Sequence, residues 1–463
     1  MKIAKKRLDI GIEKYVALFM LIIGFVMMNL VPTWQTPDER THLNMIGFEI
    51  GKDDTFSDKI YNDIDLEAGR ILQNFDEKVD IDLLSKAMTE KPDYTRREML
   101  PEGVRLTIVR HLPATIGILT GIIIGLPSYW VLILGELFAL IFYVTVSFKA
   151  LKLMPLKKEV FASIMLMPMA LHQAGSLNYD AVVLPLIFLL IGYVFKLKYQ
   201  EKIELIDFVK LASLCLIISY IKMPYVVLAF LVFVLPIDNI YVRFGKYEID
   251  GKVLRKIRIP FCIIGGILFG IAVYFLRDVF YIEMILSLIT EWKRSLYLFY
   301  QTGVAHTRAM IISTVGNFGW LDTPIRYDFA IMVFVVIAAF AIVNSDENSE
   351  VRLKTWDRIV IWGVAIVACL FTTAAMVNHT IMTILYGSEW AEGTYDIRTA
   401  LYQIPYIGGI QGRYFLPFVS LFFIPLPQVK RVNKKLIWSM VALFEVVMFI
   451  YIIHKLLERY WLA

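Results

Sequence analysis

Charged residues are scarce in this sequence, and that scarcity decides the class of protein. They make up 19% of the 463 residues, whereas hydrophobic residues make up 58%; a soluble domain is about one quarter charged. The apolar residues form uninterrupted runs, such as 16–28 and 224–236. These runs lack the 3.6-residue period of an amphipathic helix and the alternation of a barrel strand. We therefore expect an all-α, polytopic integral membrane protein whose spans are helices.

Nucleotide-binding motifs and cysteine frameworks are also missing. The sequence contains no G-x-G-x-x-G or Walker motif, and its three cysteines lie in or beside apolar runs without the spacing of a metal site. No segment between the predicted spans reaches the roughly 100 residues that a separate nucleotide-binding domain needs. A donor substrate should therefore arrive through the membrane or as a small soluble molecule. The net charge of +5 is spread over short clusters between apolar runs, so it does not indicate nucleic acid.

The basic clusters predict the orientation. A basic N-terminus precedes the first apolar run without a cleavage signal, so we expect an uncleaved first span in the cell membrane, with a cytoplasmic N-terminus. If the other clusters are also cytoplasmic, one membrane domain covers 1–463 with about eleven spans. These spans are expected near 15–32, 129–150, 160–175, 181–195, 208–221, 224–236, 259–276, 328–343, 358–376, 414–427 and 436–454.

The segment 112–126 is apolar but short. It has about 15 residues and carries one proline and three glycines, whereas a span needs about 20 residues. Counting it as a span would place basic clusters outside. We therefore interpret it as a re-entrant or interfacial helix that follows a long extracytoplasmic segment at about 33–111. The alternative is a true span with another span missed elsewhere.

The stretch PTWQTPDERTH at 32–42 follows the first predicted span. Asp38 and Glu39 are adjacent carboxylates with His42 nearby, and a carboxylate beside the hydrocarbon boundary is suited to act as a general base on a hydroxyl. A structural interpretation competes with this one. Thr36 and Pro37 also form a good helix start, in which Glu39 closes a capping box.

Two further polar stretches interrupt the apolar pattern. GSLNYDA at 175–181 carries Asp180, and GNFGWLDTP at 316–324 carries Trp320 and Asp322. Trp320 offers a surface for stacking on a sugar. Capping by Asn178 or Asp180, and a turn at Asp322, are the structural alternatives and are the favoured ones.

Cationic side chains are also expected near the outer face. Arg413, in IQGRYFLP at 410–417, is suited to bind a phosphate with two hydrogen bonds. Lys222 lies between two predicted spans. There it either helps Arg413 to bind the phosphate or extends toward the lipid headgroups. Glu136 and Glu445 lie well inside spans. They are functional candidates by default, yet as a protonated pair or packing partners they remain outside the predicted site.

Together these motifs resemble a large family of bacterial and archaeal predicted membrane proteins of unknown function. The resemblance rests on Pro-Asp-Glu-x-x-His at 37–42, Asp180, Gly319 to Pro324, and Gln411 to Pro417, in that order. It extends over about residues 20–430. One departure is Glu136, because such sequences are expected to carry an arginine near Gly135.

That family is in turn similar to glycosyltransferases of the GT-C class, which use polyprenyl-phosphate-linked sugars at the outer membrane face. The resemblance implies an inverting transfer to an extracytoplasmic glycan, cell-wall polymer or lipid. Asp38 and Glu39 would be the catalytic acidic pair, or ligands of a divalent cation such as Mg²⁺ or Mn²⁺. The substrate-binding residues would be His42, Asp180, Trp320, Asp322, Lys222, Arg413 and Tyr414. A transporter of lipid-linked glycans, or a non-catalytic scaffold of an envelope-assembly complex, are the alternatives.

Overall fold

The computed structural model describes residues 11–53, 56–60, 77–90, 94–244, 247–251, 280–344, 352–381 and 397–462, with a few isolated positions between them. The chain forms two compact units. The first comprises Met1–Phe195, Val315–Val351 and Leu426–Ala463, and the second comprises Lys196–Thr314 and Arg352–Pro425.

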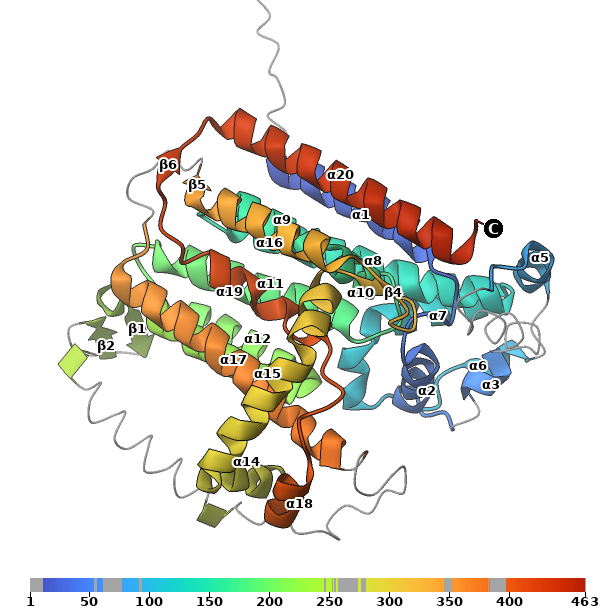
Figure 1. Cartoon of the computed structure of the whole chain (residues 1–463), viewed down its shortest axis with the longest axis horizontal. Helices are drawn as coiled ribbons and strands as arrows, with labels where there is room; N and C mark the ends of the chain where they lie inside the picture. Colours follow the sequence, from blue (N-terminus) through green and yellow to red (C-terminus); the bar gives the residue numbers. More distant parts are fainter. Residues whose placement is uncertain are drawn as a thin grey trace, which may run out of the picture. The chain divides into compact units, whose positions relative to one another are not determined.

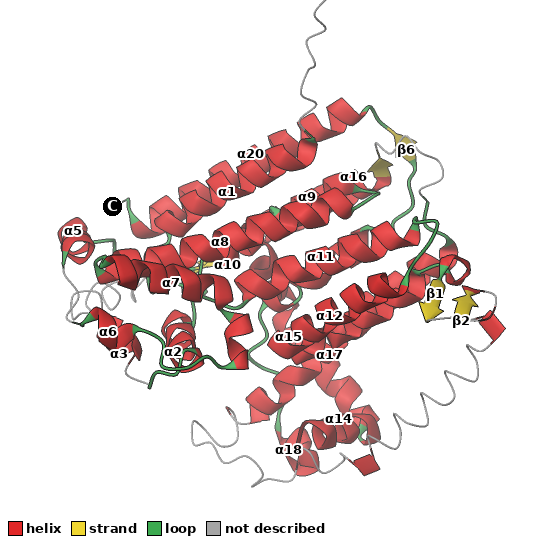
Figure 2. Cartoon of the chain, turned by 180° about the vertical axis from the view of Figure 1, so that it is seen from behind, coloured by secondary structure: helices red, strands yellow, loops and turns green. Residues whose placement is uncertain are grey.

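The first unit is built from long apolar helices. α1 (Ile12–Leu30), α8 (Ser128–Leu153) and α20 (Lys434–Tyr460) lie in it, with most of α11 (Asp180–Lys198) and the shorter α16 (Tyr327–Ile342). α20 runs beside α1 (Figures 1 and 2). Near the start of α20, β6 (Lys430–Arg431) pairs in parallel with β5 (Val343–Asn344).

The second unit contains α12 (Leu205–Ile221), the 3-10 helix η2 (Met223–Val234), α17 (Thr355–Ile381) and α19 (Val419–Phe423). α17 packs against η2. A β-hairpin joins β1 (Tyr241–Phe244) to β2 (Tyr247–Asp250). The predicted outward loops at 277–327 and 377–413 also contain helices: α14 (Phe280–Thr290), α15 (Trp292–Val315) and α18 (Ile397–Gln403).

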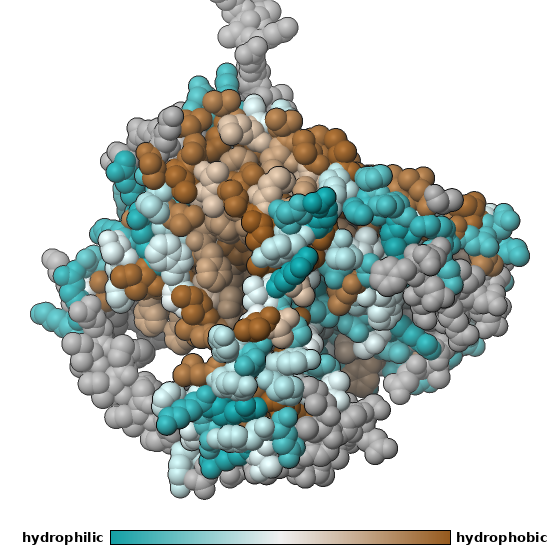
Figure 3. Space-filling model, in the orientation of Figure 1, coloured by the Kyte–Doolittle hydropathy of each residue, from teal (hydrophilic) through white to brown (hydrophobic). Residues whose placement is uncertain are grey.

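Five described helices are long and apolar enough to cross a membrane: α1, α8, α11, α17 and α20. α16 and η2 are shorter apolar helices. Figure 3 shows apolar side chains gathered over α16 and the first part of α20, where Val335 and Leu443 are at least 60% exposed. Apolar side chains in such numbers are stable on the surface only when lipid or another helix covers them. The chain is therefore a polytopic, mostly helical membrane protein.

Two predicted spans differ from the structure. The span at 160–175 is broken into α9 (Lys158–Met165) and α10 (Pro168–Ala174), because Pro168 cannot continue a helix and instead starts the second one. The continuous helix at 414–427 is wrong: this stretch forms the 3-10 turns η5 (Gly412–Tyr414) and η6 (Leu416–Phe418), followed by α19. The predicted span at 259–276 lies almost entirely outside the described residues, so the count of eleven stays a prediction.

The apolar segment at 112–126 forms α7 (Leu112–Ile124), which packs along α8. Glycines permit the close approach: a Cβ added at Gly117 would lie 2.2 Å from the Leu134 carbonyl oxygen. Small residues at such contacts let two membrane helices pack backbone to backbone. The chain then turns at Gly125, whose φ of 74° favours glycine.

Both ends of α7 contact the segment at 33–111. This segment contains α2 (Glu39–Glu49), α3 (Phe56–Ile60), α5 (Ile81–Thr89), α6 (Arg96–Met99) and the 3-10 turn η1 (Leu106–Arg110). At the start of α7, His111 binds Glu49 of α2; at its end, Gly125 lies against Arg96 of α6. Thirteen residues span only about 20 Å of helix. This arrangement favours the re-entrant or interfacial interpretation.

Single cysteines test the predicted orientation. Glu102 and Glu201 are both exposed, so each is replaced by cysteine in a variant without native cysteines. We expect the cysteine at 102 to react with a membrane-impermeant thiol reagent in intact cells, because 33–111 is predicted to be extracytoplasmic. The cysteine at 201 should react only after the membrane is opened. The reverse pattern would contradict the orientation.

Candidate functional site

The loop before α2 has an unusual backbone. Trp34 and Asp38 have φ angles of 72° and 66°, in a region that residues other than glycine seldom enter. α2 begins at Glu39, so the expected helix start at Pro37 is wrong, and the Asp38 side chain makes no capping hydrogen bond. Asp38 is exposed, whereas Glu39 beside it is buried. The two predicted catalytic carboxyls therefore have different environments.

Glu39 joins three parts of the first unit. Its carboxyl accepts a hydrogen bond from the backbone N–H of Trp34 at 2.8 Å. The backbone N–H groups of Thr36 and Leu177 and the carboxyl of Glu136 lie close to the same carboxyl. The loop before α2, the turn before α11 and helix α8 are thus held by one buried side chain.

Glu39 and Glu136 share a hydrogen bond. A carboxylate can only accept hydrogen bonds, so the pair must carry at least one proton. Burial is the main cause that raises the pKa of Glu39 above its ordinary value of 4.5, and the hydrogen bonds that Glu39 accepts oppose it in part. Glu136, which the sequence interpretation left outside the site, belongs to it. Its suggested pairing with Glu445 is wrong, because the polar neighbour of Glu445 is Ser163.

The turn before α11 meets α2. Asn178 Oδ1 accepts the backbone N–H of Asp180 at 2.9 Å, which confirms Asn178 as the cap of this helix. The Tyr179 ring lies edge-on to the His42 imidazole, with 4.9 Å between ring centroids. Asp180 is 7% exposed. The stretches at 32–42 and 175–181 therefore come together, as predicted.

The stretch at 316–324 approaches the same loop. It forms a small hairpin of β3 (Asn317–Phe318) and β4 (Thr323–Pro324), and the Trp320 indole N–H at its tip donates to the Trp34 carbonyl at 2.8 Å. Half of the Trp320 side chain is exposed and remains available for stacking. Asp322 instead accepts hydrogen bonds from the guanidinium of Arg459 in α20, at 2.9 and 3.0 Å. Asp322 thus anchors the hairpin.

The C-terminal end of α20 contacts the hairpin, the segment at Val79 and the end of α1. The Tyr460 hydroxyl lies where a Cβ at Gly319 would be, so this tip of the hairpin, with φ of 60°, requires glycine. The Tyr460 carbonyl accepts the N–H of Val79 at 2.8 Å. The Trp461 indole donates to the Leu30 carbonyl at the end of α1, also at 2.8 Å.

The predicted cationic residues gather in the second unit. The Lys222 ammonium lies 5.2 Å from the centre of the Tyr414 ring and 5.6 Å from that of Tyr225. The Arg413 guanidinium carbon lies 5.6 Å from the Tyr414 ring centre, and Arg413 is 6% exposed. Gly412 permits this arrangement, because a Cβ there would lie 2.2 Å from the Met310 carbonyl of α15. Lys222, Arg413 and Tyr414 thus form one cluster.

A metal ion at Asp38 and Glu39 stays a prediction. Within the described part of the chain, no three His, Cys, Asp or Glu side chains are grouped to hold a metal ion. The two residues also differ in exposure, and Glu39 is already engaged by backbone N–H groups and by Glu136. The pair as described does not present two carboxylates to one ion.

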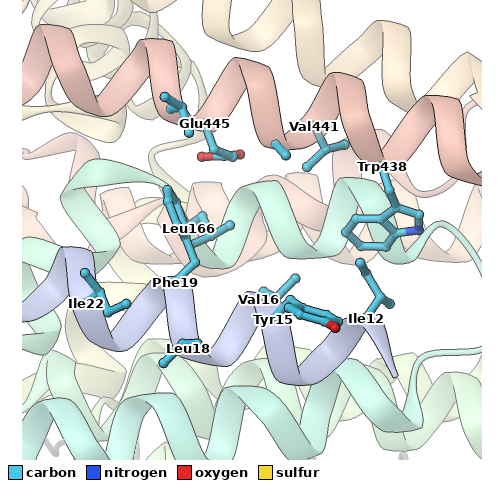
Figure 4. A pocket seen from close by; sticks show the side chains of 12 residues that line it. Ile12, Tyr15, Val16, Leu18, Phe19, Ile22, Leu166, Trp438, Val441 and Glu445 are labelled. Atoms are coloured by element: carbon cyan, nitrogen blue, oxygen red, sulfur yellow. The ribbon is translucent and has the colours of Figure 1, made fainter. Parts of the chain in front are cut away.

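A separate groove lies between α1 and α20. Its volume is about 320 Å³, and Tyr15 and Phe19 of α1 and Trp438 of α20 are among its lining residues. Figure 4 shows the Glu445 carboxyl in this otherwise apolar lining. Glu445 is 1% exposed, and neither of its oxygens has a hydrogen-bond partner within bonding geometry among the residues that the structure describes.

Comparison with protein families gives a match over residues 19–422 to a family described as predicted membrane protein, DUF2142. The chain belongs to this family. The match covers all of the motifs discussed above and confirms the resemblance to a family of predicted membrane proteins. Comparisons with curated proteins and with solved structures give no match.

The shared proton of Glu39 and Glu136 predicts a pH dependence of stability. Between pH 4.5 and the higher folded-state pKa, Glu39 carries a proton in the folded protein and releases this proton when the protein unfolds. Its contribution is therefore complete below pH 4.5 and is lost as the pH rises through the higher folded-state pKa. We expect the free energy of unfolding to fall by up to about 1.4 kcal/mol per pH unit in this window. Thermal unfolding in detergent at a series of pH values measures it.

Glu136→Gln supplies an amide donor in place of the shared proton, so this variant should lose stability less steeply as the pH rises. Glu102→Gln is the control, because the Glu102 side chain is 72% exposed and its ion pair is with Lys52, away from Glu39 and Glu136 in the sequence. An unchanged slope in Glu136→Gln would contradict the shared proton.

Proposed function

We propose that the protein is a membrane glycosyltransferase that moves a sugar from a polyprenyl-phosphate donor to an extracytoplasmic acceptor hydroxyl. One observation carries the proposal: three polar stretches far apart in the sequence converge in the first unit. They place an exposed carboxylate, Asp38, on the same loop as Trp34, whose carbonyl holds the half-exposed Trp320. Sugar sites commonly combine a carboxylate with an aromatic face, since the aromatic ring offers apolar surface and the carboxylate a strong hydrogen-bond acceptor.

Asp38 is the proposed general base. As the acceptor oxygen bonds to the anomeric carbon, Asp38 takes the hydroxyl proton, and the bond from that carbon to the phosphate oxygen breaks. The leaving polyprenyl phosphate keeps the electron pair. A single displacement of this kind inverts the configuration. The strained φ of Asp38 supports the assignment, because such strain is concentrated at functional sites.

Glu39 has a positioning role in this proposal. It is 2% exposed, accepts the backbone N–H of Trp34 and lies close to that of Leu177 before α11. It therefore fixes the loop that presents Asp38. The cluster of Lys222, Arg413 and Tyr414 is suited to bind the donor phosphate, because a guanidinium and an ammonium together stabilise charge on a departing phosphate.

Asp38→Asn tests the base. It keeps the size of the side chain, and asparagine tolerates the left-handed backbone of this position, so protein abundance should be unchanged. The rate of transfer from a radiolabelled polyprenyl-phosphate sugar by the purified protein should fall by roughly 10²–10⁴. Glu102→Gln, which removes an exposed carboxylate of the same unit, should leave the rate unchanged.

Transfer by Asp38→Asn at more than about a tenth of the wild-type rate would exclude Asp38 as the base. Wild-type protein that transfers none of a range of polyprenyl-phosphate sugars would favour a transporter or a scaffold instead. Uptake of a lipid-linked glycan into vesicles separates these two.

Arg413→Gln tests the phosphate cluster. Loss of a charge-assisted hydrogen bond costs about 1.5–3 kcal/mol, so KM for the donor should rise roughly 10–100-fold, with KM for the acceptor unchanged. Arg413→Lys should recover part of the loss, because it restores charge. Arg326→Gln is the control, since Arg326 is exposed and already paired with Asp328. Equal KM values in the 413 and 326 variants would refute the assignment.

A further inference from the structure

The groove between α1 and α20 extends to the start of α1. Ile12, the first residue of this helix, lines it together with Trp438 of α20. Further along the two helices, the rings of Phe19 and Phe449 meet edge-on, with 5.9 Å between their centroids. The helices are therefore in contact at these rings, and the groove separates them closer to their first residues.

The groove has the length and the chemistry of a lipid chain. Its lining on α1 runs from Ile12 to Ile22, and these ten steps along a helix rise about 15 Å. The hydrocarbon core of a bilayer is about 30 Å thick, so each leaflet contributes about 15 Å. The lining is mostly apolar (Figure 4). Tyr15 and Leu18 are 55% exposed, so the groove is open to the surrounding lipid.

Basic side chains gather at the starts of the two helices. Glu13 of α1 forms an ion pair with Lys158 of α9, and Lys434 of α20 lies close enough to act on the same carboxylate. Lys14 and Lys435 are exposed at the same two helix starts. Positive charge therefore exceeds negative charge among the described residues there. Such clusters at the hydrocarbon boundary attract anionic lipid headgroups.

Two aromatic side chains lie just inside these lysines. Tyr15 follows Lys14 directly, and Trp438 follows Lys434 by one turn. Both of them line the groove. Tyrosine and tryptophan are enriched at the boundary between headgroups and hydrocarbon, because their rings are amphipathic. The groove thus presents basic, then aromatic, then apolar side chains, which is the order of charge, boundary and hydrocarbon in a phospholipid.

We propose that the groove binds one anionic phospholipid. The phosphate lies at Lys14, Lys434 and Lys435, and one acyl chain lies between α1 and α20. Glu445 follows Lys434 by three turns, roughly 16 Å, so it lies beside the far part of the chain and away from the headgroup. Its polar neighbour is Ser163 of α9, which is buried in the protein.

The proposed lipid belongs to one leaflet. In the predicted orientation, the starts of α1 and α20 are cytoplasmic, so the lipid comes from the cytoplasmic leaflet. The polyprenyl-phosphate donor of the proposed function has its phosphate at the opposite face. The lipid site is thus separate from sugar transfer and goes beyond that function. It places a lipid between two helices that are also joined at their other ends, where Trp461 donates to Leu30.

Fluorescence quenching in nanodiscs tests the site with the full-length protein. The probes are phosphatidylglycerol, which is anionic, and phosphatidylcholine, which is zwitterionic, each brominated on the upper part of one acyl chain. Bromine quenches a tryptophan that it contacts. Because the chain has nine tryptophans, the signal of Trp438 is taken as the difference between wild type and Trp438→Phe. We expect half-quenching at a roughly tenfold lower mole fraction of phosphatidylglycerol. Equal values for the two lipids would overturn the proposal.

A double variant tests the headgroup site. Lys434→Gln combined with Lys435→Gln removes charge at the phosphate, so the values for the two lipids should come within about threefold of each other. Lys149→Gln combined with Lys152→Gln is the matched control. It removes two exposed lysines from the end of α8 and should keep the preference for phosphatidylglycerol. Equal preference in the two double variants would refute the headgroup site.

Ala442→Phe tests the groove. Ala442 is an exposed lining residue of α20, so a phenyl ring there fills the groove without entering the core, and the preference should be lost. Leu443→Phe is the control, since Leu443 is the neighbouring exposed residue outside the lining, and it should keep the preference. A preference that persists in Ala442→Phe would refute the proposal. Failure of both lipids to quench Trp438 would also refute it, because another helix would then cover the groove; crosslinking of Ala442→Cys would show whether that helix belongs to a second copy.

Discussion

The arrangement of the candidate site depends on one buried carboxyl. Glu39 accepts the backbone N–H of Trp34, lies close to that of Leu177 and contacts Glu136 in a helix that is long enough to span the membrane. A carboxyl removed from water is costly unless it has polar partners. The loop and the turn therefore have little freedom to move apart, because either movement would take polar partners from this buried carboxyl. The exposed Asp38 next to it benefits from this rigidity while remaining accessible.

Much of this could be predicted from the sequence, for a physical reason. Polar residues in an apolar chain are expensive unless they are gathered together. The polar stretches at 32–42, 175–181 and 316–324 were therefore visible as candidates, and they do meet. The long helices were equally clear, because uninterrupted apolar runs in lipid permit few other structures.

Other features had no local signal. Glu136 was interpreted as a member of a protonated pair or as a packing partner, because its neighbour in the fold, Glu39, is almost one hundred residues away in the sequence. Glu49 and His111 look like ordinary loop residues, since only the tertiary fold brings them together. Asp322 was predicted to bind substrate, yet Arg459 of the last described helix engages it. The helix predicted at 414–427 is replaced by short turns, where Gly412 brings the backbone against α15. Hydropathy measures the cost of insertion and is insensitive to such backbone contacts.

The end of α20 has a consequence for how the protein is made. Arg459, Tyr460 and Trp461 hold, in turn, the 316–324 hairpin, the segment at Val79 and the end of α1. All of these partners precede α20 in the chain, so the ribosome delivers them first. The first unit is thus assembled around a position that α20 must fill. Until α20 is in place, Asp322 lacks its guanidinium partner. The candidate site therefore takes the form described above only after α20 has been made.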